Sequence, residues 1–135
     1  MMTPLRSETL PLREASDILL VRQLVRECAA ELGFGLLDQT KLITAASELG
    51  RNTLIHGGGG KVLLETLLKN KRRGLRLTFE DQGPGIADLE QAMTDGFTTR
   101  GGLGLGLGGS KRLVNEFELV SRVGEGTRVT MTRWT

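Results

Sequence analysis

Two glycine clusters decide the fold of this chain: Asp81-Gln82-Gly83-Pro84-Gly85, and Gly101-Gly102-Leu103-Gly104-Leu105-Gly106-Leu107-Gly108-Gly109. Glycine is used where the backbone takes a positive φ or approaches a ligand closely. The second cluster leads into Lys111-Arg112-Leu113-Val114-Asn115-Glu116-Phe117, whose apolar spacing predicts a helix over about 109–117. A glycine loop before a helix N-terminus offers free N–H groups and the positive end of the helix dipole, an arrangement that suits a phosphate chain.

A third motif, Glu48-Leu49-Gly50-Arg51-Asn52, lies earlier in the chain, inside another helical pattern. Residues four apart share one face of a helix. The carboxylate of Glu48 and the carboxamide of Asn52 are therefore expected to lie side by side. Together the three motifs indicate a nucleotide site.

The composition indicates an ordinary globular protein. The chain of 135 residues is expected to form a single domain, residues 1–135, with its own hydrophobic core. Its 19 glycines concentrate at 57–60, 83–85 and 101–109, so they mark particular loops rather than a low-complexity sequence. A net charge of +2 is too small to argue for nucleic acid, and one Trp with no Tyr offers no base-stacking surface. We therefore expect no nucleic-acid partner.

The remaining global features bear on location. Cys28 stands alone and cannot form an internal disulfide; it falls among apolar residues at helical spacing, which predicts a small buried side chain rather than a reactive thiol.

No stretch is apolar for long enough to cross a bilayer, and the N-terminus lacks the apolar region of a signal peptide. We expect a cytoplasmic protein with no membrane partner.

The periodicity of the apolar residues predicts helices and strands in a mixed order. The first strand, at 5–14, is expected at a sheet edge because an edge tolerates Pro11. Asp17 is expected to cap the first helix, and Gly33 to end it. The predicted helices are about 16–32, 38–56, 88–94 and 109–117, and the predicted hairpins pair 62–68 with 75–80 and 118–123 with 127–134. This order predicts an α+β fold, a two-layer α/β sandwich with helices on one face of a largely antiparallel sheet.

With these motifs assembled, the chain resembles the GHKL superfamily of ATP-binding domains, which share the Bergerat fold. The N-box of that superfamily matches Glu48 to Asn52, its adenine box matches Asp81 to Gly85, and its lid box matches Gly102 to Gly106. The Gly126-Thr127 step matches a further family element. Three motifs in the family order, at compatible spacing, are far more specific than one glycine motif alone.

The resemblance narrows to the RsbT-type serine/threonine switch kinases of bacterial stress responses, through runs such as Ala46-Ser47-Glu48-Leu49 and Asp95-Gly96-Phe97-Thr98-Thr99. His56 and the glycines at 57–60 resemble the sporulation-type anti-sigma kinases at least as closely. The resemblance implies a protein serine/threonine kinase that uses ATP and Mg²⁺. It also implies STAS-domain antagonist proteins as substrates, and a PP2C-type phosphatase or a sigma factor as a further partner.

Carried onto this sequence, the resemblance assigns the base-binding residues. The carboxylate of Asp81 would accept a hydrogen bond from the adenine amine, and Thr127 would support the same edge of the base directly or through water. Gly83 and Gly85 would let the backbone pass close to base and sugar. The alternatives are a turn carboxylate that bonds its own backbone at Asp81, and an ordinary strand-start threonine at Thr127.

The phosphate end is assigned in the same way. Asn52 would place its carboxamide oxygen on Mg²⁺, and Glu48 would act as the catalytic base near the γ-phosphate. Gly102, Gly104 and Gly106 would wrap the phosphates. The alternatives are solvated helix residues at Glu48 and Asn52 and a flexible linker at the glycines.

Two other functions stay open at this stage. The chain could be an anti-sigma factor that sequesters a sigma factor directly, or a nucleotide-binding module without transferase activity, because the same ATP-binding fold serves several unrelated activities.

Overall fold

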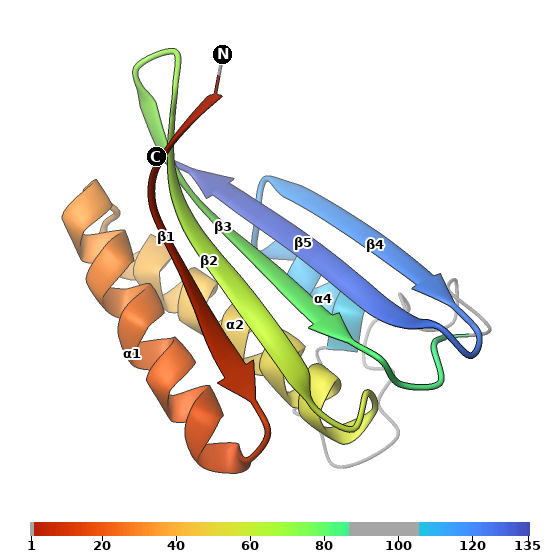
Figure 1. The fold of residues 1–135 in the computed structure, drawn as a ribbon. Coiled ribbons are helices and arrows are strands. Elements are labelled where there is room, and N and C mark those ends of the chain that lie inside the picture. The colour runs from red at the N-terminus through yellow and green to blue at the C-terminus, as the bar shows by residue number, and fades with distance from the viewer. Residues whose placement is uncertain (1, 87–105) are drawn as a thin grey trace.

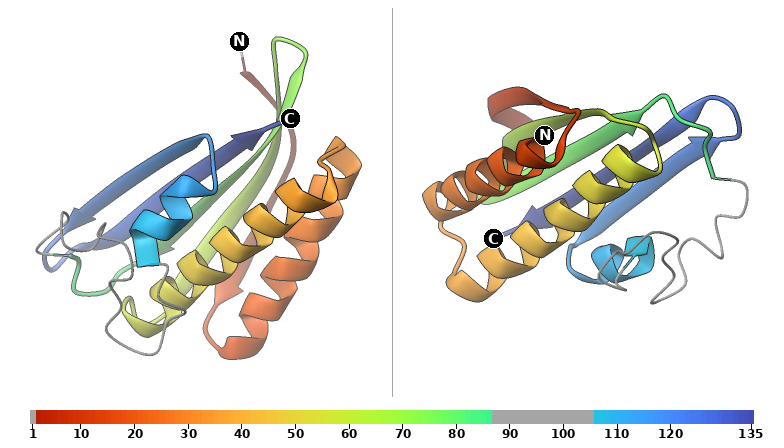
Figure 2. Two further views of the ribbon diagram at one scale, coloured as in Figure 1. Left: turned by 180° about the vertical axis from the view of Figure 1, so that it is seen from behind. Right: turned by 90° about the horizontal axis from the view of Figure 1, so that it is seen from below.

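The structure, a computed structural model, describes residues 2–86 and 106–135. In these residues five antiparallel strands form one sheet in the order β1-β2-β3-β5-β4. Helices α1, α2 and α4 lie on one face of that sheet (Figures 1 and 2). The predicted α+β class, with helices on one face of an antiparallel sheet, is confirmed.

The elements have well-defined bounds. They are β1 (Met2–Leu12), α1 (Ala15–Leu32), α2 (Leu36–Ile55), β2 (Gly60–Lys69), β3 (Arg72–Asp81), α4 (Gly106–Arg112), β4 (Glu116–Arg122) and β5 (Gly126–Trp134). β1 pairs only with β2 and lies at the sheet edge, as Pro11 predicted. The helix predicted at 88–94 lies outside the described residues.

α1 forms where expected but begins differently. Asp17 caps this helix as predicted, but from inside it: Glu14 is the N-cap residue, and Asp17 stands three residues later as the second member of a capping box. There its carboxylate accepts hydrogen bonds from the backbone N–H groups of Arg13 (2.8 Å) and Glu14 (3.1 Å). An acidic side chain in the first turn satisfies N–H groups that the helix itself leaves unpaired, so Asp17 stabilises the same helix end from inside it.

The helix predicted over 109–117 is wrong in its second half. α4 ends at Arg112, and Phe117 belongs to β4, where it pairs with Met131 of β5. Phe117 and Leu119 alternate with exposed Glu116 and Glu118, so the strand period accounts for this stretch better than the helix period. The backbone N–H of Asn115 also donates to the Thr132 carbonyl (3.0 Å), which starts the ladder immediately after α4.

The core lies between the sheet and the helices. Its fully buried members come from every layer: Leu12, Val21, Val25, Leu42, Leu64, Leu75, Leu77, Phe79 and Met131. Cys28 is a free, fully buried thiol within this cluster, and burial raises its pKa. The predicted buried, unreactive cysteine is therefore confirmed in its burial. None of the described helices is long and apolar enough to span a membrane.

The β4–β5 turn gives a matched test of backbone geometry. Gly126 has φ 102° and a Cβ there would collide with the Asp81 carbonyl, whereas Gly124 has φ 82° with open space around it. Gly126→Ala is expected to lower the free energy of unfolding by about 2–4 kcal/mol, since backbone strain and a clash add. Gly124→Ala should cost about 1 kcal/mol, from φ alone. Urea unfolding of both variants measures the difference, and equal losses would contradict the contact at Gly126.

Candidate functional site

Four of the predicted site residues, Asp81, Gly83, Gly85 and Thr127, lie together at one end of the sheet. There the last residue of β3, Asp81, meets the loop after α2 at Gly57 and the β4–β5 turn at Gly126. A Cβ on Gly57 would lie 2.5 Å from Oδ2 of Asp81, and a Cβ on Gly83 would lie 2.7 Å from Cα of Gly57. Three segments that are distant in sequence therefore approach to backbone contact around one carboxylate.

The Asp81 carboxylate is half-buried and held in place. Its Oδ1 accepts a hydrogen bond from the Gly83 N–H at 2.9 Å, so the turn interaction that was the alternative assignment is present. Burial raises the pKa of Asp81, and hydrogen bonds from the backbone of Gly83 and Thr127 partly oppose that rise. A half-buried carboxylate with a raised pKa is a common feature of ligand-binding sites, although the turn hydrogen bond to Gly83 gives Asp81 a structural role as well.

The predicted glycines of the Asp81–Gly85 motif serve the protein's own packing. Gly83 allows the approach to Gly57, and Gly85, at φ 76°, lies against the carbonyl of Arg122. In the described residues the close approaches that Gly83 and Gly85 permit are thus between protein backbones. They shape the loop that follows Asp81.

Thr127 is tied to that loop through Ser121, a residue that the sequence analysis missed. The two hydroxyl oxygens are 2.8 Å apart, and Ser121 Oγ also accepts from the N–H of Ile86 (2.8 Å) and donates to the Gly126 carbonyl (3.2 Å). Ser121 and Thr127 pair across the β4–β5 hairpin. The strand alternation was the available signal, because it places position 121 directly opposite Thr127.

Glu48 and Asn52 lie one helical turn apart on α2, as predicted. Glu48 is only 2% exposed, so the alternative of a solvated glutamate is wrong. Its Oε1 has no hydrogen-bond partner among the described residues. Asn52 is half-buried, and its backbone carbonyl accepts from the N–H groups of His56 (3.0 Å) and Gly57 (3.2 Å), where α2 ends and the glycine loop begins.

The lid-box motif, Gly102 to Gly106, is described only in part. Gly102 and Gly104 lie outside the described residues. Gly106 is the first residue of α4, which packs against α2. Within the described residues there is no group of three or more His, Cys, Asp and Glu side chains that could hold a metal ion.

The comparison with protein families decides the wider relationship. Residues 37–134 match the family described as Histidine kinase-, DNA gyrase B-, and HSP90-like ATPase. The chain belongs to this ATPase family. The matched range contains Glu48, Asn52, Asp81 and Thr127, so the ATPase-family domain includes every described part of the candidate site.

Relatives within the ATPase family narrow the assignment. The chain is 49% identical over 118 residues to "Serine/threonine-protein kinase RsbT" of Bacillus subtilis, across 87% of this chain and 89% of that protein. It is 36% identical over 118 residues to an "Anti-sigma F factor" of Thermoanaerobacter sp. (strain X514), across 84% of this chain and 82% of that protein. The chain is thus a member of the RsbT-like serine/threonine-protein kinases.

A solved structure supports the fold independently. The crystal structure of the RsbU and RsbW domains of a Mycobacterium tuberculosis protein superposes with a TM-score of 0.65 at 24% sequence identity. The match covers 97% of this chain and 32% of that longer chain. At 24% identity this structural similarity supports the fold alone.

The site residues fit a nucleotide and a hard cation. The buried Oε1 of Glu48 has no hydrogen-bond partner among the described residues, which is costly unless another group supplies one. Asp81 offers an acceptor held by the Gly83 N–H, and Asn52 offers a carboxamide oxygen of the type that Mg²⁺ accepts. The donor set therefore agrees with the family assignment.

Proposed function

We propose that this chain is an ATP- and Mg²⁺-dependent protein kinase that phosphorylates serine or threonine residues of STAS-domain antagonist proteins. The observation that carries the proposal is the buried carboxylate of Glu48. It is 2% exposed, its Oε1 has no partner among the described residues, and it lies one helical turn from Asn52. A structural glutamate would be paired at this depth, whereas a base awaiting a substrate hydroxyl would not.

Each residue has a defined task in this proposal. Asp81 accepts a hydrogen bond from the adenine amine. It thereby selects ATP over GTP, because guanine has a carbonyl oxygen at that position, which is itself an acceptor. Thr127, steadied by Ser121, supports the same edge of the base. Asn52 holds Mg²⁺ beside the phosphates, and Glu48 takes the proton of the incoming hydroxyl. Bound ATP supplies the phosphoryl group, so the protein contributes positioning and charge neutralisation, which are the main requirements of phosphoryl transfer.

The wider role follows from the kinship with RsbT. We propose that phosphorylation of the antagonist releases the kinase, which then binds and activates a PP2C-type phosphatase upstream of an alternative sigma factor. The anti-sigma F factors among the relatives support a second candidate, in which the kinase sequesters a sigma factor directly. Co-purification separates the two, because only the second candidate retains a sigma factor.

The test is transfer of phosphate from γ-labelled ATP to purified STAS-domain proteins. The expected result is Mg²⁺-dependent labelling of one serine or threonine, which mass spectrometry identifies. Tight ATP binding without labelling of any STAS-domain protein would replace the kinase with a nucleotide-binding module that lacks transferase activity.

A further inference from the structure

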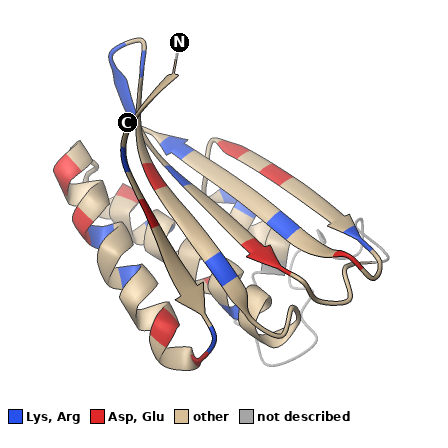
Figure 3. Ribbon diagram, in the orientation of Figure 1, with Lys and Arg blue, Asp and Glu red and all other residues tan. Residues whose placement is uncertain are grey.

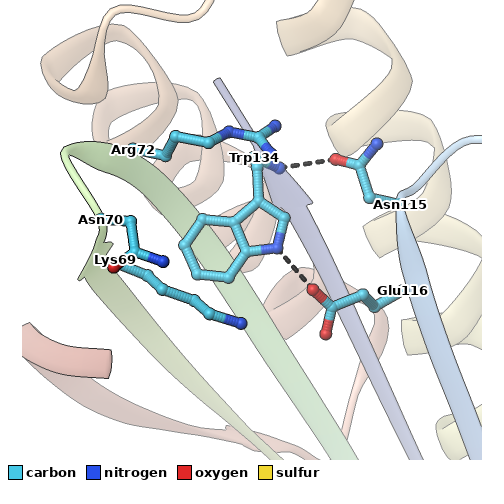
Figure 4. A pocket seen from close by; sticks show the side chains of 6 residues that line it. All are labelled: Lys69, Asn70, Arg72, Asn115, Glu116 and Trp134. Atoms are coloured by element: carbon cyan, nitrogen blue, oxygen red, sulfur yellow. Dashed lines mark hydrogen bonds between the residues drawn. The ribbon is translucent and has the colours of Figure 1, made fainter. Parts of the chain in front are cut away.

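A second hollow lies at the opposite end of the sheet from Asp81. It has a volume of about 440 Å³ and is lined by Lys69, Asn70, Arg72, Asn115, Glu116 and Trp134 (Figure 4). β3 runs from Arg72 at this hollow to Asp81 at the nucleotide site, so ten residues of extended strand, roughly 30 Å, separate the two. The hollow is therefore no part of the proposed ATP site.

Trp134 forms a fixed wall of the hollow. Met131 belongs to the core between the sheet and the helices. The strand alternation therefore places Trp134 on the other face of the sheet, away from the helices. A Cβ on Gly74 would lie 2.5 Å from the indole, so the ring rests directly on the backbone of β3. The indole N–H donates to Glu116 Oε2 (2.5 Å), and the backbone N–H of Trp134 donates to Asn115 Oδ1 (2.6 Å). An aromatic residue held by three elements is preorganised for contact.

The rim of the hollow is strongly basic. The β2–β3 hairpin carries four exposed cations within five residues, Lys69, Lys71, Arg72 and Arg73, and Figure 3 shows them gathered at its projecting end. The Lys69 ammonium stands over the indole, 5.9 Å from its centroid. Glu116 is the one carboxylate of the lining, and it is engaged by the indole. Arg72 Nε donates to the backbone oxygen of Thr135 (3.2 Å), and among the residues that line the hollow the cations Lys69 and Arg72 face a single acidic side chain, Glu116.

We propose that this hollow is a docking site for an acidic segment of a partner protein. Carboxylates of the segment would pair with Lys69 and with the hairpin cations, while the segment's backbone and apolar atoms would pack against Trp134. The charge complementarity selects an acidic partner. A nucleic acid fits less well, because one face of the indole lies on Gly74 and Lys69 stands over the ring, so no open ring face is offered for a base to stack on.

The position of this site has a mechanistic consequence. Because it lies at the far end of β3, a bound segment would leave the Asp81 end of the sheet accessible. A partner could then be held through successive binding and release of nucleotide. This docking site does not depend on whether the chain transfers phosphate.

Trp134 makes the test direct, since it is the one tryptophan of a chain without tyrosine. The probe is a ten-residue peptide of alternating Glu and Ala, titrated into the full chain without nucleotide while Trp134 fluorescence is recorded. We expect a saturable change that weakens as salt rises from about 50 to 300 mM. An isosteric Gln-Ala peptide should give no response.

Two double variants form a matched pair. Lys69→Gln with Arg72→Gln removes two cations that face each other across the β2–β3 ladder at the hollow. Lys61→Gln with Arg128→Gln removes one Lys and one Arg, also exposed, at the other end of the same sheet face. We expect the first pair to weaken peptide binding about five- to thirtyfold and the second to change it less than twofold. Both should keep the thermal midpoint and ATP affinity of the wild type.

Several outcomes would overturn the proposal. They are no saturable response to the peptide, equal weakening by the two double variants, an equal response to the Gln-Ala peptide, or binding of a single-stranded oligonucleotide in preference to the acidic peptide. ATP binding is measured separately, so failure of this site is distinguishable from failure of the proposed kinase function.

Discussion

Replacing Glu48 by Gln is expected to lower phosphoryl transfer to a STAS-domain protein at least about a hundredfold, with ATP affinity within a few-fold of wild type. A positioned base contributes about 10²–10⁴ in rate, and glutamine cannot take the proton. Glutamine keeps the size and polarity of the side chain, and an amide is less costly than a carboxylate at a position 2% exposed. α2 and Asn52 should therefore stay in place. Single-turnover transfer and calorimetric titration with ATP give the two quantities.

Glu65→Gln is the matched control for this variant. Glu65 is also partly buried, but it lies on β2 and pairs with Arg76 at 3.0 and 3.2 Å, on the sheet face away from the helices. Its replacement should cost some stability and leave the transfer rate unchanged. Transfer at the wild-type rate by Glu48→Gln would remove Glu48 from the role of base. A parallel loss in both variants would indicate a general effect on folding.

Asn52→Ala distinguishes the two neighbours on α2. Removing the carboxamide should weaken Mg²⁺-dependent ATP binding as well as transfer, because it removes the proposed metal oxygen. The Asn52 backbone carbonyl, which accepts from His56 and Gly57, is unaffected by this change. We therefore expect Glu48→Gln to lower the transfer rate alone, whereas Asn52→Ala should lower both the transfer rate and the Mg²⁺-dependent ATP affinity.

The sequence predicted the fold well because its strongest signals are local and mutually consistent. The helix predicted at 38–56 forms as α2, where Leu42, Ala45, Ala46 and Leu49 lie at helical spacing and are all buried, and the β2–β3 hairpin has the predicted pairing. The error at 109–117 has a physical cause. A short helix followed at once by an alternating strand gives apolar spacings that fit either period over a few residues. Pairing of Phe117 with Met131, which no local pattern contains, decided the outcome.

The site was predictable in its residue types and only partly in its geometry. Helical spacing predicted that Glu48 lies next to Asn52, and the family resemblance implied that Asp81 and Thr127 lie close together; these two residues are partners across β3 and β5. Burial of Glu48 was not predictable, because it depends on how the helices pack. The contact of Gly57 with Asp81 joins two loops that lie far apart in sequence, and the glycine run at 57–60 gave no sign of its partner. Trp134 over Gly74 was missed for the same reason.

Asp81→Asn is expected to weaken ATP binding by about 1.5–3 kcal/mol, roughly 10- to 150-fold in affinity. The change removes the charge of the acceptor and presents an amide donor toward the adenine amine, which is also a donor. Calorimetric titration with ATP measures the loss. Asp38→Asn is the control: Asp38 pairs with Arg133 at 2.6 Å, and its loss should lower stability without changing ATP affinity.

The same substitution should leave the nucleotide-free protein at least as stable as wild type at pH 7. Burial raises the pKa of Asp81 in the folded chain above its ordinary value near 3.8, so the folded state holds the proton more tightly than the unfolded chain. Ionised Asp81 therefore costs stability above the folded pKa, and this cost disappears as pH falls through that pKa. Asparagine carries no charge above or below that pKa, so the variant does not have this pH-dependent cost. The advantage of Asp81→Asn in thermal midpoint should accordingly shrink on acidification.

These two effects of Asp81→Asn have opposite signs, which makes the pair diagnostic. A carboxylate that serves only the turn, through its bond to the Gly83 N–H, would lose stability on substitution and leave ATP affinity unchanged. Asp38→Asn should show that pattern, because its carboxylate stabilises the fold through Arg133. A gain or no change in stability together with a large loss of ATP affinity is expected only where the fold retains a buried charge for a ligand. Unchanged ATP affinity in Asp81→Asn would exclude Asp81 from adenine recognition.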